Sequence, residues 1–569
     1  MTKLTEVEYI RPDLAEFREK VEAELANFKN AGGFATAKLA VEHIDSLFSD
    51  LGSYAELASF RYTIDTRDEF YSKENDFWNE NYPHVNELNT AFAEAVLASP
   101  FRDELVADGT ILKPFVLMAQ NQVKTFKKEL IPEYQKEAAL TTEYGKLIAS
   151  AEIDFQGESL NLSQLGKYGV STDDAVRKAA NQACTAWFVE HEAQFDRIYD
   201  ELVKLRTKIA HESGFKDFAE MSFANRDRFG YDQEMINNYR AAVKEYVTPA
   251  VTRFYERQAK RFGKDKLNYF DLGLEFPTGN ATPKGTPEEL VAKANQMYHE
   301  MSPETGRFFD FMVDNETMDL VSKKGKEGGG YCNFIQKWDA PIIFANFNGT
   351  SGDVDVLTHE AGHAFQTYMA QWIKMPGMQF PTIEAAEFFS MSMEFMAYPW
   401  MKLFFEEQTQ KYKYSHLAGT MTFLPYGVLV DHFQYEVYTH PEMTPDERKA
   451  TWRRLEKEYQ PYKDYSEDAD LDRGTWWYRQ GHIFEVPFYY IDYTIAQVVA
   501  QQFWKRREVD HDETAWSDYL AMAKAGGSKT MMELLQIGHL DSPFEGDTLK
   551  EITQDIEAQL NSISEDDLK

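Results

Sequence analysis

Two histidines four residues apart, His359 and His363, constrain the fold of this chain more than any other feature of its sequence. Residues at this spacing lie on one face of an α-helix, so a helix here would direct both imidazoles toward one point. The residues from 354 to 368 contain no proline, and their one glycine, Gly362, is small enough to let another element approach closely. The pattern predicts a continuous helix that presents two imidazole ligands to one metal ion.

A third ligand is expected from a second helix, which the sequence predicts to begin after Pro381. The helix carries several apolar residues, and a buried carboxylate is costly unless it is paired or bound to metal. Glu387 is favoured as the ligand over Glu384, whose alternative role is a first-turn glutamate stabilised by the helix dipole. Glu394, two turns beyond Glu387, is a candidate to accept the free ring N–H of a liganding histidine, or else a surface charge.

This ligand set predicts one Zn²⁺ per chain. Catalytic zinc sites keep three protein ligands and an open position, where the ion lowers the pKa of a bound water and polarises a carbonyl. Glu360, one residue after His359, would take the proton of that water as general base and pass it to the leaving amine. The sequence therefore predicts a zinc peptidase. The alternative is a coincidental pair of ordinary histidines.

Several segments around these residues resemble the oligoendopeptidase F and thimet oligopeptidase family of zinc peptidases. The resemblance is closest to the bacterial oligoendopeptidase F and Pz-peptidase-like branch and covers roughly residues 200 to 560. The first 200 residues match only in length and helical character. The segments that carry the resemblance are 359–364 (HEAGHA), 386–390 (AEFFS), 329–332 (GGYC), 341–347 (PIIFANF), 430–438 (VDHFQYEVY) and 482–493 (HIFEVPFYYIDY).

The resemblance implies a mainly α, zincin-type metallopeptidase with a small β-sheet beside the zinc helix. Apolar residues at helical spacing, such as Phe17, Val21, Leu25 and Phe28, agree with a helical chain. We expect an N-terminal helical lobe over residues 1–200 and a catalytic region over residues 201–569. The two lobes should enclose a deep channel that only short unfolded peptides can enter. The expected activity is therefore hydrolysis of internal peptide bonds in oligopeptides.

The segment 482–493 contains candidate groups for stabilising the oxyanion of the reaction. Tyr489 and Tyr493 would share one face of a helix opened by Pro487, with Tyr490 beside them. A phenol aimed at the scissile carbonyl stabilises the negative charge that develops on it, and His482 could donate to the same oxygen. The alternative is an aromatic stripe in the core. The resemblance favours Tyr493 and His482 but leaves open which phenol reaches the substrate.

Substrate binding is expected at a strand just before the zinc helix. The residues Phe344, Ala345 and Asn346 lie in a short apolar run that is typical of a strand. The resemblance implies that this strand edges the cleft, where a peptide could add to it through main-chain hydrogen bonds. The glycine-rich stretch 323–330 predicts a turn or a mobile flap over the cleft.

The composition of the chain argues against several classes of protein. A formal net charge of −34 opposes nucleic-acid binding, because phosphate contacts need a basic surface. Two cysteines, Cys184 and Cys332, fit a reducing compartment. The chain shows no signal-like start and no run of 18 apolar residues, so we expect a cytoplasmic enzyme without membrane contact. The acidic C-terminal residues 564–569 are expected to fray, and the choice between monomer and homo-oligomer is open.

Two other functions remain possible from the sequence. A zinc carboxypeptidase of similar helical shape would use the same ligands, but it needs a cationic group near the zinc to hold the terminal carboxylate. A catalytically silent peptide-binding relative would keep the scaffold without the chemistry, which the intact set of His359, Glu360, His363 and Glu387 disfavours.

Overall fold

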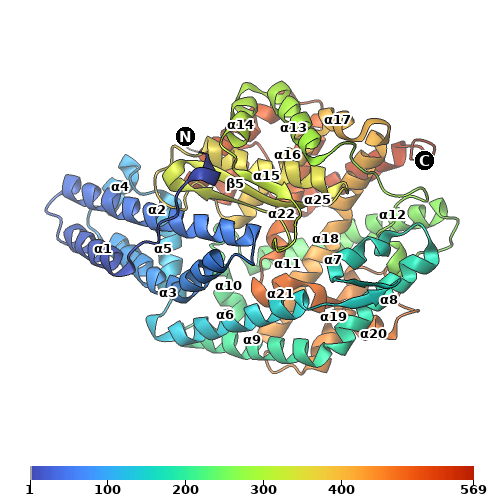
Figure 1. Cartoon of the computed structure of the whole chain (residues 1–569), viewed down its shortest axis with the longest axis horizontal. Helices are drawn as coiled ribbons and strands as arrows, with labels where there is room; N and C mark the ends of the chain where they lie inside the picture. Colours follow the sequence, from blue (N-terminus) through green and yellow to red (C-terminus); the bar gives the residue numbers. More distant parts are fainter. Residues whose placement is uncertain (1–2, 569) are drawn as a thin grey trace.

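The computed structural model describes residues 3–568 and is built mainly from α-helices (Figure 1). The N-terminal helices form one end of the molecule. The first of them begins at the cap Asp13, which accepts hydrogen bonds from the backbone N–H groups of Ala15 and Glu16, and it buries one apolar stripe. These helices are α1 (Leu14–Lys29), α2 (Phe34–Ile64), α3 (Glu69–Ala98), α4 (Arg102–Asp108) and α5 (Lys113–Thr125).

The next part of the chain crosses the molecule and adds a short antiparallel hairpin, β1 (Ile153–Phe155) and β2 (Glu158–Leu160). Its helices form the lower half of the view in Figure 1 and then rise to the top. They are α6 (Ile131–Ala149), α7 (Leu162–Gly166), α8 (Asp174–Glu190), α9 (Glu192–Glu212), α10 (Phe218–Asn225), α11 (Gln233–Ala242), α12 (Thr248–Arg261), α13 (Pro287–Met301) and α14 (Pro303–Asp314).

A three-stranded sheet lies between the N-terminal helices and the centre of the molecule. Its strands are β3 (Met318–Val321), β4 (Tyr331–Ile335) and β5 (Ala340–Phe347), in the order β3-β5-β4. Strand β5 is apolar along most of its length because both of its faces are covered. Ile342 and Phe344 pack with residues of α2, whereas Ile343 and Ala345 belong to the large central core.

The structure corrects the place predicted for this strand. We expected the strand of Phe344, Ala345 and Asn346 to edge the cleft and to pair with a peptide through its main chain, but β5 is the middle strand of the sheet. Phe344 is paired with Asp319 of parallel β3 on one side and with Tyr331 of antiparallel β4 on the other. At this position the main chain of β5 already pairs with a strand on each side, and β4 is an outer strand. The apolar run is explained by burial on two faces rather than by contact with a substrate.

The glycine-rich stretch before β4 is tied to the end of β5. The side-chain amide of Asn346 donates to the carbonyl oxygens of Glu327 and Gly329, at 2.7 and 2.9 Å. Two hydrogen bonds from β5 hold this loop in place. Of the two interpretations of the sequence, a turn therefore describes it better than a mobile flap.

The remaining elements complete the central core. The helices α15 (Gly352–Met369), α16 (Ile383–Met396) and α22 (Tyr490–Trp504) lie at its middle (Figure 1). The others are α17 (Met401–Phe405), α18 (Thr409–Thr439), α19 (Pro445–Tyr459), α20 (Ala469–Asp472), α21 (Gly481–Glu485), α23 (Ala515–Ala525), α24 (Met531–Ile537) and α25 (Gly546–Ser562). None of the helices within residues 3–568 has both the length and the apolar content that crossing a membrane requires.

Packing separates the N-terminal helices from the rest. One cluster of buried residues runs from Phe17 to Ile111 and also takes in residues of the loop after α15, such as Met375 and Met378. The main cluster begins at Leu130 and continues to Leu568. The lobe boundary that we placed at residue 200 stays a prediction, and the division in packing lies nearer residue 130.

The C-terminal residues are packed rather than frayed. The side chain of Leu568 is buried in the main core. The carboxylate of Glu565 accepts hydrogen bonds from Arg257 and Arg261 of α12, each at 2.7 Å. The expectation of a frayed tail is therefore wrong for residues 564–568, because an apolar anchor and two arginines hold this acidic segment.

Candidate metal centre

Helices α15 and α16 approach each other closely at a single glycine. A Cβ atom on Gly362 would lie 2.6 Å from the carbonyl oxygen of Phe389 and 2.7 Å from the Cα atom of Ser390. Both distances are shorter than any ordinary contact, so a side chain here would push the helices apart. The glycine between the two histidines thus allows α16 to lie against the face of α15 that carries them.

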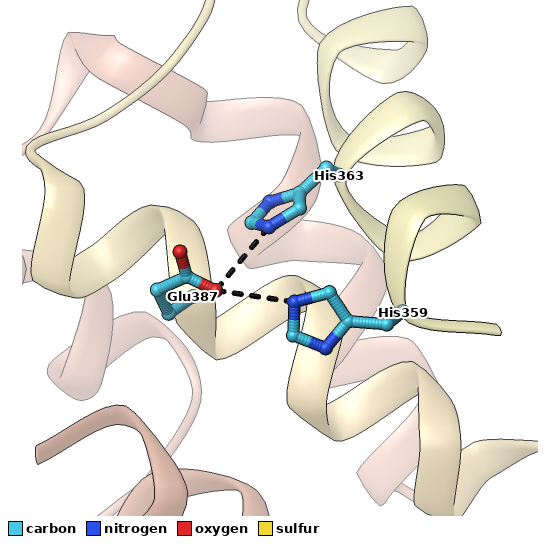
Figure 2. Close-up of side chains that lie close together, drawn as sticks. All are labelled: His359, His363 and Glu387. Atoms are coloured by element: carbon cyan, nitrogen blue, oxygen red, sulfur yellow. Dashed lines mark ion pairs between the residues drawn. The ribbon is translucent and has the colours of Figure 1, made fainter. Parts of the chain in front are cut away.

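His359, His363 and Glu387 converge on one point between these helices (Figure 2). The Nε2 atoms of His359 and His363 lie 3.4 and 3.2 Å from the same carboxylate oxygen of Glu387. One donor atom from each of the three residues lies within 4.8 Å of the other two. Two imidazole nitrogens and one carboxylate match the donor set of a catalytic zinc site, so the residues present fit a divalent ion.

Glu387 and Glu384 take different places although they are three residues apart on α16. Burial raises the pKa of Glu387, but the two imidazoles outweigh burial and hold it well below its ordinary value. Glu384 is outside the cluster, and burial raises its pKa to about 8. The structure therefore brings the favoured candidate to the histidines and directs the other away from them.

Glu394 links the candidate ligand His359 to a third histidine. One carboxylate oxygen lies 2.6 Å from Nδ1 of His359, and the other lies 2.6 Å from Nε2 of His416 on α18. The Nδ1 atom of His416 is 2.8 Å from the hydroxyl of Tyr398. The contact to Glu394 occupies Nδ1 of His359 and leaves Nε2 facing Glu387. Glu394 is largely buried and is not a surface charge.

Glu360 lies beside the cluster under the start of β4. Its side chain is buried, and burial raises the pKa of its carboxyl above the ordinary value. A Cβ atom on Gly330 would lie 3.6 Å from one of its oxygens and 3.3 Å from the carbonyl oxygen of Phe344. Glu360 thus faces the space between α15 and the sheet rather than bulk solvent.

His482 and the three tyrosines gather together near Glu387. The ring centroid of His482 lies 4.8 to 5.8 Å from those of Tyr489, Tyr490 and Tyr493. Tyr489 donates a hydrogen bond to Glu387 at 2.9 Å. Burial lowers the pKa of His482 to about 4, so its ring is neutral at pH 7. Burial raises the pKa of all three phenols, which therefore remain hydrogen-bond donors.

The helix that carries these tyrosines begins later than predicted. Helix α22 begins at Tyr490, not at Pro487, because Phe488 has a φ of 62° in the left-handed region. Tyr489 is the N-cap residue, with nearly helical dihedral angles, so its ring still lies 4.7 Å from that of Tyr493. Tyr490 packs instead against Phe423 of α18.

Sequence reasoning missed His416 and also Arg226, which follows α10. The guanidinium carbon of Arg226 lies 4.5 Å from the centre of the Tyr489 ring. Each residue is far from the motif in sequence. His416 is one of 13 histidines and Arg226 belongs to the 60 basic residues, and no local pattern singles either one out.

Comparisons with known proteins agree with this geometry. A model described as Peptidase M3 N-terminal domain matches residues 4–126, and one described as Peptidase family M3 matches residues 168–554. The comparison with curated proteins found no match.

Three solved structures are similar over nearly the whole chain. A Pz peptidase A solved with an inhibitor is 45% identical with a TM-score of 0.95, over 99% of this chain and 100% of its own. A putative oligoendopeptidase F is 46% identical with a TM-score of 0.95, over 99% and 100%. A putative oligoendopeptidase F from Bacillus anthracis str. Ames is 44% identical with a TM-score of 0.90, over 99% of each chain.

These matches confirm the resemblance seen in the sequence, the mainly α fold and the expectation of a peptidase. The family model alone spans well over half of the chain, and three relatives above 40% identity cover almost all of it. The protein is a member of peptidase family M3.

Proposed function

We propose that this peptidase is a zinc-dependent endopeptidase that cuts internal bonds of short unfolded oligopeptides. The observation that carries the proposal is the convergence of His359, His363 and Glu387 between α15 and α16, with Glu360 beside them. One Zn²⁺ would be held by these three side chains. When bound, it supplies Lewis-acid activation of water and of the scissile carbonyl.

Glu360 is proposed as the general base. It lies one residue from a ligand but is not one of the three converging donors, so its carboxylate is free to accept a proton from the attacking water. The same carboxylate then gives that proton to the leaving amine. Its place beneath β4 keeps bulk water away from the proton during the transfer.

Tyr493 and His482 are proposed to donate hydrogen bonds to the oxygen of the scissile carbonyl as negative charge develops on it. Tyr489 is already engaged with Glu387, and Tyr490 packs against α18. Tyr493 interacts with the hydroxyl of Tyr489 and not with Glu387, and among the three phenols it is the one whose pKa responds to both Glu387 and Glu360. It is therefore our choice for the phenol that reaches the substrate.

A cavity lined in part by Arg226, the residue that stacks on Tyr489, supports short substrates. It measures roughly 790 Å³ and lies between the helices α3, α5 and α6 on one side and α10 and residues 485–487 on the other. A volume of this size accommodates a few peptide residues but not a folded domain. Access through such a space would limit hydrolysis to unfolded oligopeptides.

Mass mapping of the cuts in a mixed peptide library, with and without a chelator, tests this function. We expect internal cuts that the chelator abolishes, retained cleavage of peptides blocked at both ends, and little digestion of a folded protein. Cleavage confined to free C-terminal residues would favour the carboxypeptidase alternative, and peptide binding without any cleavage would favour the silent relative.

The variant Glu360→Gln tests the role of the base. We expect the variant to keep its metal but to lose about 10²–10⁴-fold in turnover, since the amide cannot accept the proton. Metal content by elemental analysis and turnover of a quenched peptide of about ten residues measure the two effects. If the variant had the metal content and the turnover of the wild type, Glu360 would not be the general base.

A further inference from the structure

His416 of α18 uses both nitrogens of its ring, although it lies outside the cluster of candidate ligands. Its Nε2 atom is 2.6 Å from a carboxylate oxygen of Glu394, and its Nδ1 atom is 2.8 Å from the hydroxyl of Tyr398. Only 7% of its side chain is exposed. The ring therefore has a fixed orientation, because turning it would leave buried polar atoms without partners.

The hydrogen bonds along this chain of groups have one consistent direction. The phenol of Tyr398 keeps its proton at neutral pH and can donate to Nδ1 of His416. The proton of His416 is then on Nε2, which donates to Glu394. A carboxylate only accepts, so Glu394 also takes a hydrogen bond from Nδ1 of His359. The Nε2 atom of His359 is left without a proton, and it faces Glu387.

The two oxygens of Glu394 have separate partners, one in the candidate metal centre and one outside it. Oε1 meets His359, and Oε2 meets His416. The Glu394 side chain is 12% exposed, so solvent is a poor substitute for either partner. Without the contact to His416, the carboxylate would be free to turn away from His359. Hydrogen-bonded partners of this kind orient a liganding imidazole and fix which nitrogen carries the proton.

Packing holds His416 against both helices that carry the candidate ligands. Its ring lies edge-on to Phe395 of α16, with the ring centroids 5.2 Å apart. The ring of Tyr412, one turn earlier on α18, lies 5.7 Å from the ring of His416. The hydroxyl of Tyr412 donates to Asp355 at 2.6 Å, and Asp355 precedes His359 by one turn of α15. Helix α18 is thus tied to α15 and α16 on either side of the Glu394 carboxylate.

We propose that His416 is a positioning residue of the metal centre: through Glu394 it fixes the proton and the ring orientation of His359 and so strengthens metal binding. Tyr398 supports this role by fixing the proton of His416 on Nε2. The inference rests on the proposed zinc-dependent function and extends the metal centre from its three candidate ligands to α18. His416 is not one of the three converging donors, so its effect is expected on metal affinity rather than on turnover at saturating metal.

Two substitutions of His416 separate its hydrogen bond from its bulk. His416→Leu removes the donor to Glu394, and we expect the metal-free variant to bind Zn²⁺ about 10- to 100-fold more weakly than the wild type. His416→Gln keeps an N–H group that can donate, so it should recover most of that affinity. Tyr398→Phe should give a smaller loss, because it removes only the support of His416. Competition with a chelator of known affinity measures all three.

His432→Leu is the matched control. His432 lies on the same helix, and its Nδ1 atom is 3.0 Å from the hydroxyl of Tyr459 rather than from a group of the metal centre. This variant should bind Zn²⁺ as the wild type does. Urea unfolding of the metal-free variants measures any loss of stability separately from the loss of affinity.

A double variant tests whether His416 acts through Glu394. If it does, the combination of His416→Leu with Glu394→Gln should bind Zn²⁺ about as weakly as Glu394→Gln alone. Two independent effects would instead multiply in the dissociation constant.

Wild-type affinity in His416→Leu, an equal loss in His432→Leu, or losses that multiply in the double variant would each overturn the inference. So would a His416→Gln variant as weak as His416→Leu, since the hydrogen bond would then not be the cause. If His416→Leu does not fold, Tyr398→Phe takes its place, and unchanged affinity in that variant would be decisive against the inference. All of these outcomes leave the proposed function intact, whereas a wild-type protein that binds no Zn²⁺ would count against that function itself.

Discussion

At the scale of single residues, the four glutamates at and near the site differ by environment and not by type. Glu387 is held ionised by two imidazoles, whereas burial keeps Glu384 largely protonated at pH 7. Burial raises the pKa of Glu394 as well, but hydrogen bonds from His359 and His416 outweigh burial and lower it to about 2. Burial raises the pKa of Glu360. Each side chain is therefore suited to a different task by its neighbours.

The contacts of Glu394 predict a role in metal affinity. Replacing it by glutamine removes the negative charge and leaves one acceptor for two imidazoles, so we expect Glu394→Gln to weaken metal binding by about 10- to 100-fold. Competition with a chelator of known affinity measures the loss. Glu384→Gln is a matched control on the same helix, and it should bind metal as the wild type does because Glu384 is outside the cluster. Equal losses in both variants would contradict this role of Glu394.

At the scale of elements, the site depends on how closely two helices can approach. Each helix could form from its own sequence pattern, but the distance between them is set where Gly362 meets the backbone of Phe389 and Ser390. A side chain at that point would displace α16 and carry Glu387 away from the imidazoles. The glycine between the histidines is therefore a structural requirement for bringing Glu387 to the two imidazoles of the candidate metal centre.

Gly362→Ala should destabilise the protein and weaken metal binding together. We expect a loss of about 1–3 kcal/mol in the free energy of unfolding, the usual cost of overpacking, measured by urea denaturation. Gly52→Ala, inside α2, is the matched control: a Cβ there meets no atom within 4 Å, so the exchange should be neutral or slightly stabilising. Unchanged stability and metal affinity in Gly362→Ala would show that the helices can separate without cost.

At the scale of the whole molecule, ion pairs join segments that are distant in sequence. Glu192, at the start of α9, accepts hydrogen bonds from Arg473 at 2.5 and 2.6 Å and from Lys449 of α19 at 2.5 Å. Arg473 and Lys449 together outweigh burial and lower the pKa of Glu192 to about 2. Its unfolded value is the higher one, so this contribution to stability is present above about pH 4.5 and is lost as the pH falls toward 2.

The variant Glu192→Gln should therefore be less stable than the wild type at pH 7, with a smaller difference at pH 3. Denaturant unfolding of both proteins at the two pH values measures it. Glu16→Gln, which removes an exposed ion pair with Lys20, should change stability by less than about 0.5 kcal/mol at either pH. A difference for Glu192→Gln that stays constant or grows toward pH 3 would contradict the sign of this linkage.

Features that depend on local spacing were predictable from the order of the residues alone. His359 and His363 share a helix face because they are four residues apart, and the helix after Pro381 follows from its own composition. The family could be recognised because several such motifs occur together.

Contacts between groups that are distant in the chain could be identified only from the folded molecule. The apolar run of β5 is equally compatible with an edge strand and a central strand, and pairing on both sides settles that it is central. His416 and Arg226 carry no local signal, since a contact between residues far apart in the chain depends on how whole helices pack. The spacing of residues along a helix or strand determines which way their side chains point. The distances between side chains of different elements are determined by how closely those elements pack.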